Sequence, residues 1–501
     1  PAENLPEYVA DIQELFDAHD TFASYYAHAG PGVLHIRPLL NLKADDGVET
    51  MLEISDAVTD LVIEYGGSVS GEHGDGRART TWNRKLYGDE LWDAFKQLKA
   101  AFDPQGLLNP GNVCGDFDPT ENLRYDSEYE FDAGFEPTLN WDNENGFQGM
   151  AELCHGCAGC EGHQDTTGSV MCPTYRATEN EGITSTRGRA NMLRQAMSGE
   201  LPDDIFSEEF SSEVLDLCIG CKGCKRDCPS GVDMAKLKTE VKHERHQREG
   251  IPLRDKLFAN VETLYGLGSA FAPVSNWVIK VPGSSLLMEK TLGIAREREL
   301  PTFERATLTK WDSKRTPSVT ETEAERKALV IADPYTNYTQ PGVGKAAVRA
   351  LEAAGVHVEI PDAVTDSGRP AHSKSMLDDA RTTARQNVDA LAPKIADGWD
   401  VVSVEPSDAV MYQSDYLDLL SGEAVESVAD NTYSVMEYID TFRLDEAIDT
   451  TAADAVAYHG HCHQTAASRD HHAVGVLRRI GYDVDVLDTT CCGMAGSFGY
   501  E

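Results

Sequence analysis

The sequence predicts a multidomain protein of the α+β and α/β classes. A chain of 501 residues is long enough for about three domains. Eight of its 12 cysteines fall between residues 151 and 240, and two strand–helix–strand patterns follow later in the chain. We expect these divisions: an α+β domain over 1–115, a linker over 116–150, a helical cysteine-rich domain over 151–240, a helical connector over 241–325 and an α/β domain over 326–501.

Residues 1–115 alternate predicted helices and strands. The segment "GVETMLEISDAVTDLVIEYGG" has apolar residues at helical spacing, and Gly66 and Gly67 end it as a C-cap. The segment "ELWDAFKQLKAAF" predicts a second amphipathic helix, which the turn "DPQG" ends. The following residues up to 150 are acidic, aperiodic and rich in Gly and Asn, which is typical of a linker.

The last part of the chain contains an internal repeat. Its first copy reads "ALVIADP", a helix ending in "ALEAAG", and "VHVEIPDAVTDSGRP". Its second copy reads "AVAYHGHCH", a helix ending in "VLRRIG", and "YDVDVLDTTCCGMAG". Two such units predict a Rossmann-like parallel sheet with its ligand chemistry at the strand ends.

The chain is strongly acidic. Acidic residues outnumber basic ones by 84 to 44, which gives a formal net charge of −40, and the excess is spread along the chain. A nucleic-acid-binding protein needs a basic face, so we exclude that class. We expect a halophilic adaptation, in which a hydrated acidic surface keeps the protein soluble at high salt. An ordinary acidic cytosolic protein is the alternative.

The sequence predicts no transmembrane helix and no signal peptide. Clustered cysteines in a long chain indicate metal ligation in a reducing cytoplasm rather than a disulfide framework. We expect a cytoplasmic protein, with peripheral association at the inner face of the cell membrane, near Trp277, as an alternative. The chain begins at Pro1 without an initiating Met, so we also expect a fragment.

Two cysteine groups, "CHGCAGC" and "CIGCKGCKRDCP", have the spacing of 4Fe-4S ligands. Three thiolates at intervals of three wrap one cluster, and a fourth cysteine followed by Pro ligates the other cluster. Paired CxxC motifs also suit structural zinc, but zinc does not explain triplets followed by Cys-Pro. We assign the first cluster to Cys154, Cys157, Cys160 and Cys228, and the second to Cys172, Cys218, Cys221 and Cys224. These clusters carry single electrons and therefore need a donor.

The N-terminal segment holds a candidate site for the reaction that supplies those electrons. His28 and His35 stand seven apart on and beside a predicted strand, and "VSGEHGDGRART" adds Glu72 and His73 in a Gly-rich loop. Two imidazoles and a carboxylate suit an open divalent-metal site, for zinc or manganese. A metal there could hold a 2-hydroxy acid while His73 accepts the hydroxyl proton. Loop histidines bonded to backbone carbonyls are the commoner alternative.

The motifs "SGEHGDGRAR" and "LLNPGNV" resemble the C-terminal, substrate-side half of FAD-linked oxidases of the vanillyl-alcohol-oxidase type. That group includes D-lactate, glycolate and D-2-hydroxyglutarate dehydrogenases, and "STRGRANMLR" resembles its fused flavin and iron–sulfur members. The resemblance implies a cap-type α+β first domain and a bis-4Fe-4S ferredoxin-type domain after it. It also implies the site roles: metal ligands His28, His35 and Glu72, proton acceptor His73, and Asn109 close to FAD.

The sequence departs from this family in two respects. Pro31-Gly32-Val33 replaces an Asp-Gly-Asn segment, and Arg37 stands where Asn is frequent. Arg37 could make a bidentate contact with a substrate carboxylate, or pair with one of the many acidic side chains. The FAD-binding half of the family precedes this region, so we expect a missing N-terminal half to hold most of the FAD.

The C-terminal repeat resembles the cysteine-rich CCG domain of heterodisulfide-reductase-like proteins. Its second copy keeps Cys462 between two histidines, and Cys491 and Cys492 in "CCG". Its first copy has lost its cysteines, because "DSGRP" and "EPSD" stand in their place. The three thiols could hold a metal or a further cluster, and reduced cysteines packed against a sheet end are the alternative.

Together these features predict FAD- and iron–sulfur-dependent oxidation of a D-2-hydroxy acid, with D-lactate preferred, to the 2-oxo acid. FAD accepts two electrons and releases them singly, and the clusters pass them to a quinone or a protein carrier. D-2-hydroxyglutarate and glycolate are alternative substrates. The alternative function is an electron-transfer subunit without its own substrate. It is disfavoured by the presence together of His28, His35, Glu72 and His73.

Overall fold

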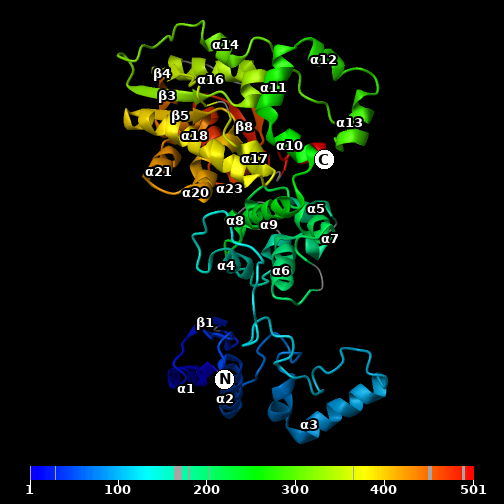
Figure 1. Ribbon diagram of the computed structural model, residues 1–501. Coiled ribbons are helices and arrows are strands. Elements are labelled where there is room, and N and C mark those ends of the chain that lie inside the picture. Colours follow the sequence, from blue (N-terminus) through cyan, green and yellow to red (C-terminus); the bar gives the residue numbers. More distant parts are fainter. Residues whose placement is uncertain are drawn as a thin grey trace. The chain divides into compact units, whose positions relative to one another are not determined.

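The computed structural model describes residues 2–28, 30–162, 172–178, 181–201, 204–364, 366–448, 454–487 and 491–501 (Figure 1). The chain divides into two compact units, residues 1–130 and 131–501, and each has its own apolar core. None of the helices in these ranges is long and apolar enough to cross a membrane.

The first unit is an α+β unit built on a β-hairpin. Its elements are α1 Leu5–Ala18, β1 Ala23–His28, β2 Val33–Pro38, α2 Gly47–Glu64 and α3 Thr80–Phe102. Tyr8, Ile12 and Phe16 recur every fourth residue of α1 and are buried, as an amphipathic helix requires. Leu34 and Ile36 of β2 pack against this row together with apolar residues of α2. The helices therefore cover one face of the hairpin.

Both helices predicted for this unit are present. α2 ends at Glu64, and Gly66 follows with a positive φ of 70°. α3 begins earlier than predicted, because it continues across a kink at Gly88 (φ 76°). It ends at the predicted turn, where the Asp103 carboxylate accepts hydrogen bonds from the backbone N–H groups of two turn residues at 2.9 Å. The described chain then has no helix or strand until residue 146.

The second unit begins with a helical part. Its helices are α4 Gly146–Glu152, α5 Pro173–Ala177, α6 Thr186–Met197, α7 Glu208–Phe210, α8 Gly223–Asp227 and α9 Met234–Glu249. They share an apolar core in which Cys154, Cys160 and Cys224 are buried. A second helical segment follows, with α10 Leu253–Ala259, α11 Val261–Ala270, α12 Val274–Val278, α13 Ser284–Leu292 and α14 Leu308–Asp312.

The second unit continues as a four-stranded parallel sheet in the order β4-β3-β5-β6. The strands are β3 Arg326–Ile331, β4 Val356–Glu359, β5 Trp399–Ser403 and β6 Thr432–Ser434. The helices between them are α15 Pro334–Tyr338, α16 Pro341–Ala353, α17 Arg369–Ser373, α18 Leu377–Ala396, α19 Pro406–Val410, α20 Tyr416–Leu419 and α21 Glu423–Asp430.

Helices cover both faces of this sheet. Leu329 and Val401 pack into the core that includes α18, whereas their neighbours Val330 and Val402 pack into the core that includes α16. Residues of a strand alternate between faces, so a strand covered on both sides reads as a continuous apolar run. Figure 1 shows α16 and α18 on opposite sides of β3 and β5. This accounts for the apolar segment "ALVIA" in the sequence.

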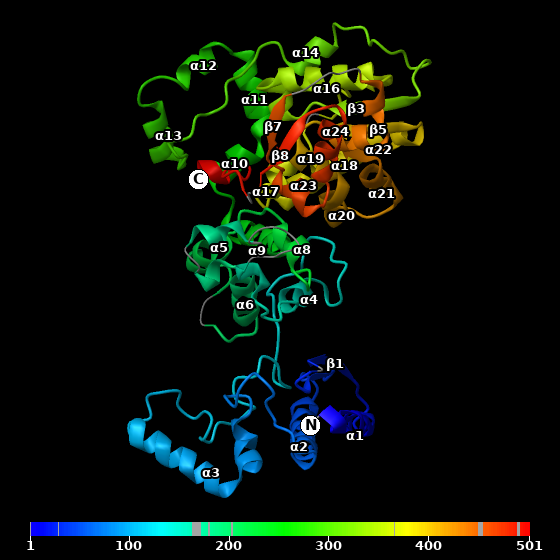
Figure 2. The same ribbon diagram turned by 180° about the vertical axis from the view of Figure 1, so that it is seen from behind.

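The second predicted strand–helix–strand unit also forms a parallel pair, but in a separate sheet. Its elements are β7 Ala455–Tyr458, α23 Cys462–Ala466, α24 His471–Arg479 and β8 Asp483–Val486, and α22 Val435–Thr441 precedes them (Figure 2). The sequence predicts one sheet for both units. In the described ranges β7 and β8 pair only with each other, and the larger sheet ends at β4 and β6.

Candidate metal and iron–sulfur centres

The hairpin of the first unit presents a polar face away from its core. Tyr26 pairs with His35 across the two strands, and His28 pairs with Val33. Residues two apart on a strand share a face, so His28 and His35 lie on the same side, as does Arg37. The ring centroids of His28 and His35 are 5.2 Å apart. The sequence predicts His35 beside a strand, and the structure places it within β2.

A loop after α2 brings Glu72 to this face. Gly71 precedes it, and a Cβ atom at Gly71 would lie only 2.8 Å from a methyl group of Val33 on β2. Any larger residue at this position would therefore push the loop away from the hairpin. The close approach explains why a glycine stands directly before Glu72.

The two histidines and the glutamate converge. One candidate ligand atom from each of His28, His35 and Glu72 lies within 4.8 Å of the others. His35 Nε2 is 3.1 Å and His28 Nε2 is 3.4 Å from the nearer oxygen of Glu72. His35 Nε2 is buried and makes no hydrogen bond in the described part of the chain. A donor set of two imidazoles and one carboxylate with an unsatisfied nitrogen fits a divalent cation.

The other predicted residues of this unit differ in position. His73 Nε2 lies 3.4 Å from Glu72 Oε1, and the His73 ring is 5.3 Å from that of His35, so His73 adjoins the converging set. Arg37 is exposed. Asn109 lies in the exposed loop after α3, where its side-chain oxygen accepts a hydrogen bond from Asn112 at 2.9 Å.

In the second unit the two cysteine groups form duplicate loops. In each loop a glycine with positive φ precedes the second cysteine: Gly156 (79°) in one and Gly220 (69°) in the other. In each a residue other than glycine with positive φ follows that cysteine: Ala158 (58°) and Lys222 (60°). The two loops thus repeat the same pair of backbone turns around their second cysteine, as two loops that each wrap one cluster would.

The first loop closes on the predicted partner. Cys154, Cys157 and Cys160 line one small cavity with Cys228, which comes from the end of the second loop. For the second set, burial raises the pKa of the Cys221 thiol, and the neighbouring thiols Cys218, Cys462 and Cys172 raise it further. Cys172 lies near thiols of both groups, since after burial it also contributes to raising the pKa of Cys160.

Helix α6 supplies donors to both cysteine sets, and these donors were not predicted from the sequence. The backbone N–H of Arg187 donates to Cys160 Sγ at 3.3 Å, and the Asn191 side chain donates to Cys154 Sγ at 3.5 Å. Arg189 Nη1 donates to Cys172 Sγ at 3.5 Å. Residues 187 and 191 are four apart and share a helix face, whereas 189 points elsewhere. Basic and amide residues at this spacing, between two cysteine groups of an acidic chain, are the signal that could have identified them.

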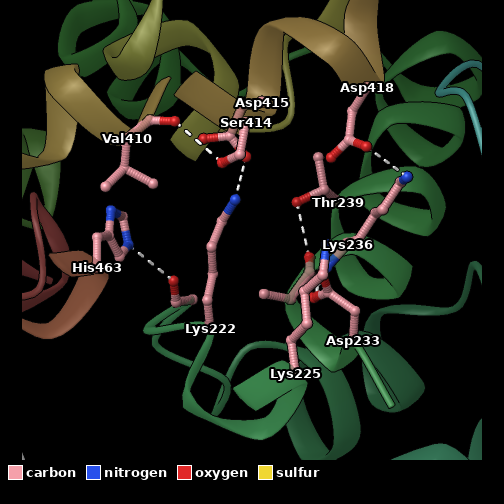
Figure 3. Close-up of polar contacts among 12 residues, drawn as sticks. Lys222, Lys225, Asp233, Lys236, Thr239, Val410, Ser414, Asp415, Asp418 and His463 are labelled. Atoms are coloured by element: carbon pink, nitrogen blue, oxygen red, sulfur yellow. Dashed lines mark hydrogen bonds and ion pairs between the residues drawn. The ribbon is translucent and has the colours of Figure 1, made fainter. Parts of the chain in front are cut away.

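The second cysteine loop is anchored to the C-terminal part of the same unit (Figure 3). Lys222 forms an ion pair with Asp415, which is fully buried and also pairs with Arg369. His463 Nε2 donates to the Gly220 carbonyl oxygen at 3.1 Å. These contacts hold the loop beside α23, which begins at Cys462.

The C-terminal thiols also lie near one another. Burial raises the pKa of Cys462 to about 11, with further contributions from Cys491 and Cys492. All three border one cavity with Cys218. That these three thiols hold a metal or a further cluster stays a prediction.

Two regions of the chain match known protein families. Residues 1–113 match the family model of the C-terminal domain of FAD linked oxidases, and residues 150–232 match that of the 4Fe-4S dicluster domain. The predicted cofactors, FAD and two 4Fe-4S clusters, are thereby confirmed. The predicted ligand sets, the domain limits and the CCG assignment stay predictions.

The curated relatives include longer proteins. The chain is 29% identical over 548 residues to D-2-hydroxyglutarate dehydrogenase of Escherichia coli, a match that covers all of this chain and 52% of the relative. It is 26% identical over 547 residues to the protein of the same name from Pantoea ananatis, again covering all of this chain and 52% of the relative. It is 36% identical over 113 residues to glycolate oxidase subunit GlcD from E. coli, covering 22% of each.

The chain thus spans about half the length of the D-2-hydroxyglutarate dehydrogenases that it matches from end to end. No solved structure is significantly similar to it.

Proposed function

We propose that the protein is the substrate-side and iron–sulfur part of an FAD-linked D-2-hydroxy acid dehydrogenase, and that its substrate is D-2-hydroxyglutarate. The observation that carries this proposal is the convergence of His28, His35 and Glu72 with His73 beside them. Matches at full coverage to proteins named D-2-hydroxyglutarate dehydrogenase favour this substrate over D-lactate.

Each residue of the converging set has a distinct task. His28, His35 and Glu72 would hold a divalent cation, which would supply a positive charge for the C1 carboxylate and the C2 hydroxyl of the substrate. His73 lies next to this set without belonging to it, so its imidazole is free to take the hydroxyl proton. Bound FAD supplies a hydride acceptor, and the two 4Fe-4S clusters supply one-electron transfer.

Arg37 supports the choice of a substrate with two carboxylates. It shares a hairpin face with His35, two residues along β2, which places the two Cα atoms roughly 7 Å apart. Its guanidinium makes no hydrogen bond or ion pair with the residues that the structure describes. An unpaired cation beside the metal ligands can bind a second substrate carboxylate in bidentate fashion. D-lactate has no group for this contact.

The test is dye reduction by the intact, anaerobically prepared flavoprotein with D-2-hydroxyglutarate, D-lactate and glycolate in parallel. We expect the highest kcat/KM with D-2-hydroxyglutarate. Arg37→Met should raise KM for D-2-hydroxyglutarate by about tenfold or more and leave turnover of D-lactate unchanged. Arg84→Met is the matched control, because Arg84 is an exposed arginine of α3 that pairs with Asp89.

Two results would contradict the proposal. A higher kcat/KM with D-lactate would restore the substrate first predicted from the sequence. No turnover with any of the three acids, in protein that carries FAD and iron, would favour an electron-transfer subunit without its own substrate.

A further inference from the structure

A large cavity of the second unit lies at the carboxyl edge of the four-stranded sheet. Its volume is about 1230 Å³, and its lining includes Asp333 and Glu405. Asp333 follows the last residue of β3 by two positions, and Glu405 follows that of β5 by two. From β3 the chain crosses first to β4 on one side and later to β5 on the other, so β3 and β5 flank the topological switch point. Parallel sheets bind ligands in the crevice at this point.

The same cavity borders the second cysteine loop. Cys218, Gly220 and Lys222 line one part of it, and Cys462 lines another. The Lys222–Asp415 ion pair and the His463 contact to Gly220 hold the two parts together (Figure 3). A molecule bound in this cavity would therefore lie beside Cys218, which we assign to the second cluster.

The cavity contains buried carboxyl groups that are available to a ligand. Asp333 is 1% exposed, and its Oδ1 caps α15 by accepting from Thr336 N at 2.8 Å. Its Oδ2 has no hydrogen-bond partner in the described part of the chain. Asp408 is also buried and accepts a hydrogen bond from Ser367 Oγ. Burial raises the pKa of Asp333 to about 7 and holds the pKa of Asp408 well above its usual range. Neutral carboxyl groups of this kind can donate protons.

Aromatic side chains form another part of the lining. Tyr265, Tyr335, Phe498 and Tyr500 all border the cavity. Tyr335 is 49% exposed and Phe498 is 43% exposed, so both side chains are accessible to a ligand. Aromatic faces bind flat apolar rings by stacking. The cavity thus combines an aromatic surface, proton donors and proximity to redox thiols.

We propose that this cavity binds the electron acceptor, a quinone, and that Asp333 and Asp408 supply its protons. The inference rests on the proposed function. Oxidation of one hydroxy acid to the 2-oxo acid releases two electrons and two protons. The quinone takes up two electrons, each of its carbonyl oxygens gains one proton from a carboxyl group, and the product is the hydroquinone. The two carboxylates then regain protons from solvent.

The first test measures binding of decylubiquinone to the intact holoprotein by equilibrium dialysis, without substrate. We expect saturable binding that Tyr335→Ala weakens by about tenfold or more. Phe271→Ala is the matched control, because Phe271 is 67% exposed and does not border the cavity. Absence of saturable binding to the wild-type protein, or equal affinity in Tyr335→Ala, would overturn the assignment of the site.

The second test uses Asp333→Asn, which keeps the shape and the helix cap but cannot supply an acidic proton. Hydroxy-acid-dependent reduction of decylubiquinone should fall by about 10²-fold. Reduction of ferricyanide, which takes up one electron and no proton, should stay at the wild-type rate. Asp389→Asn, on the exposed face of α18, should change neither rate.

The outcomes separate this inference from the proposed function. Wild-type quinone reduction by Asp333→Asn, or equal loss with both acceptors, would refute the proton-donating role. Binding of decylubiquinone without oxidation of any hydroxy acid would refute the proposed function, but it would still support the assignment of the quinone site.

Discussion

Arg189 should raise the reduction potential of the second iron–sulfur cluster. Its side chain is 1% exposed, and Nη1 lies 3.5 Å from Cys172 Sγ. The other two guanidinium nitrogens, Nε and Nη2, have no hydrogen-bond partner among the described residues. A buried cation that is directed at a cluster ligand favours the cluster state with one more negative charge, which is the reduced state.

The size of the effect follows from the distance. The two charges are the Arg189 guanidinium and the electron added to the cluster, and the Cys172 sulfur lies between them. At a separation of roughly 6 Å and an effective dielectric constant of ~20, two unit charges interact by about 3 kcal/mol. For a one-electron couple, about 1.4 kcal/mol corresponds to ~59 mV. The added electron is spread over the whole cluster, so we expect Arg189→Met to lower the potential by about 50–100 mV.

The assay is a potentiometric titration of the reconstituted protein, followed by electron paramagnetic resonance. Arg194→Met is the matched control, because Arg194 is a buried arginine of the same helix whose guanidinium pairs with Glu200. Arg189→Lys should recover part of the potential. An unchanged potential in Arg189→Met, or the same shift in the control, would refute the electrostatic reasoning.

Three further predictions concern the metal ligands and the buried carboxylates. Glu72→Gln should lower bound divalent metal by at least about tenfold in elemental analysis, with the far-ultraviolet circular dichroism unchanged, and full metal content would contradict the ligand role. Asp415→Asn should reduce the free energy of unfolding by about 3–5 kcal/mol in urea titrations, because it leaves Lys222 and Arg369 without their buried counter-ion; Asp389→Asn should be neutral. Asp333 has its pKa raised by burial to about 7, so the folded state binds a proton that the unfolded state releases above about pH 4. The contribution of Asp333 to the free energy of unfolding should therefore fall by up to ~1.4 kcal/mol per pH unit between about pH 4 and 7, and Asp333→Asn should lack this contribution; an equal pH dependence of unfolding in the wild type and the variant would refute the assignment.

The sequence predicts those features that depend on local spacing. The two cysteine loops are recognisable because three ligands of each lie within seven residues, and the exchange of the fourth follows a known rule. The end of α3 is predictable because the turn after it contains Pro and Gly. His28, His35 and Glu72 are spread over 45 residues, so their residue types suggest a metal site, with loop histidines as the commoner alternative, and the resemblance to a family strengthens that expectation.

Features that depend on packing could not be predicted. The direction of Arg189 is fixed by the packing of α6 between the two cysteine loops. From the sequence, Asp408 indicates only a cysteine missing from the first repeat, because its burial near Asp333 depends on the fold. The order β4-β3-β5-β6 is what makes β3 and β5 neighbours, and thereby places Asp333 and Glu405 after adjacent strands; the sequence does not encode strand order locally.

The cavity that Cys228 shares with the first cysteine loop makes the two cysteine loops interdependent. In the ligand sets that we assign, the first cluster takes Cys228 from the second group and the second cluster takes Cys172 from the segment after the first loop, so neither cluster has a complete set of ligands until both parts are folded. Iron loading should then be cooperative: protein titrated with limiting iron would divide into fully loaded and empty molecules. An iron-starved cell would accordingly keep fewer complete electron pathways instead of many interrupted ones.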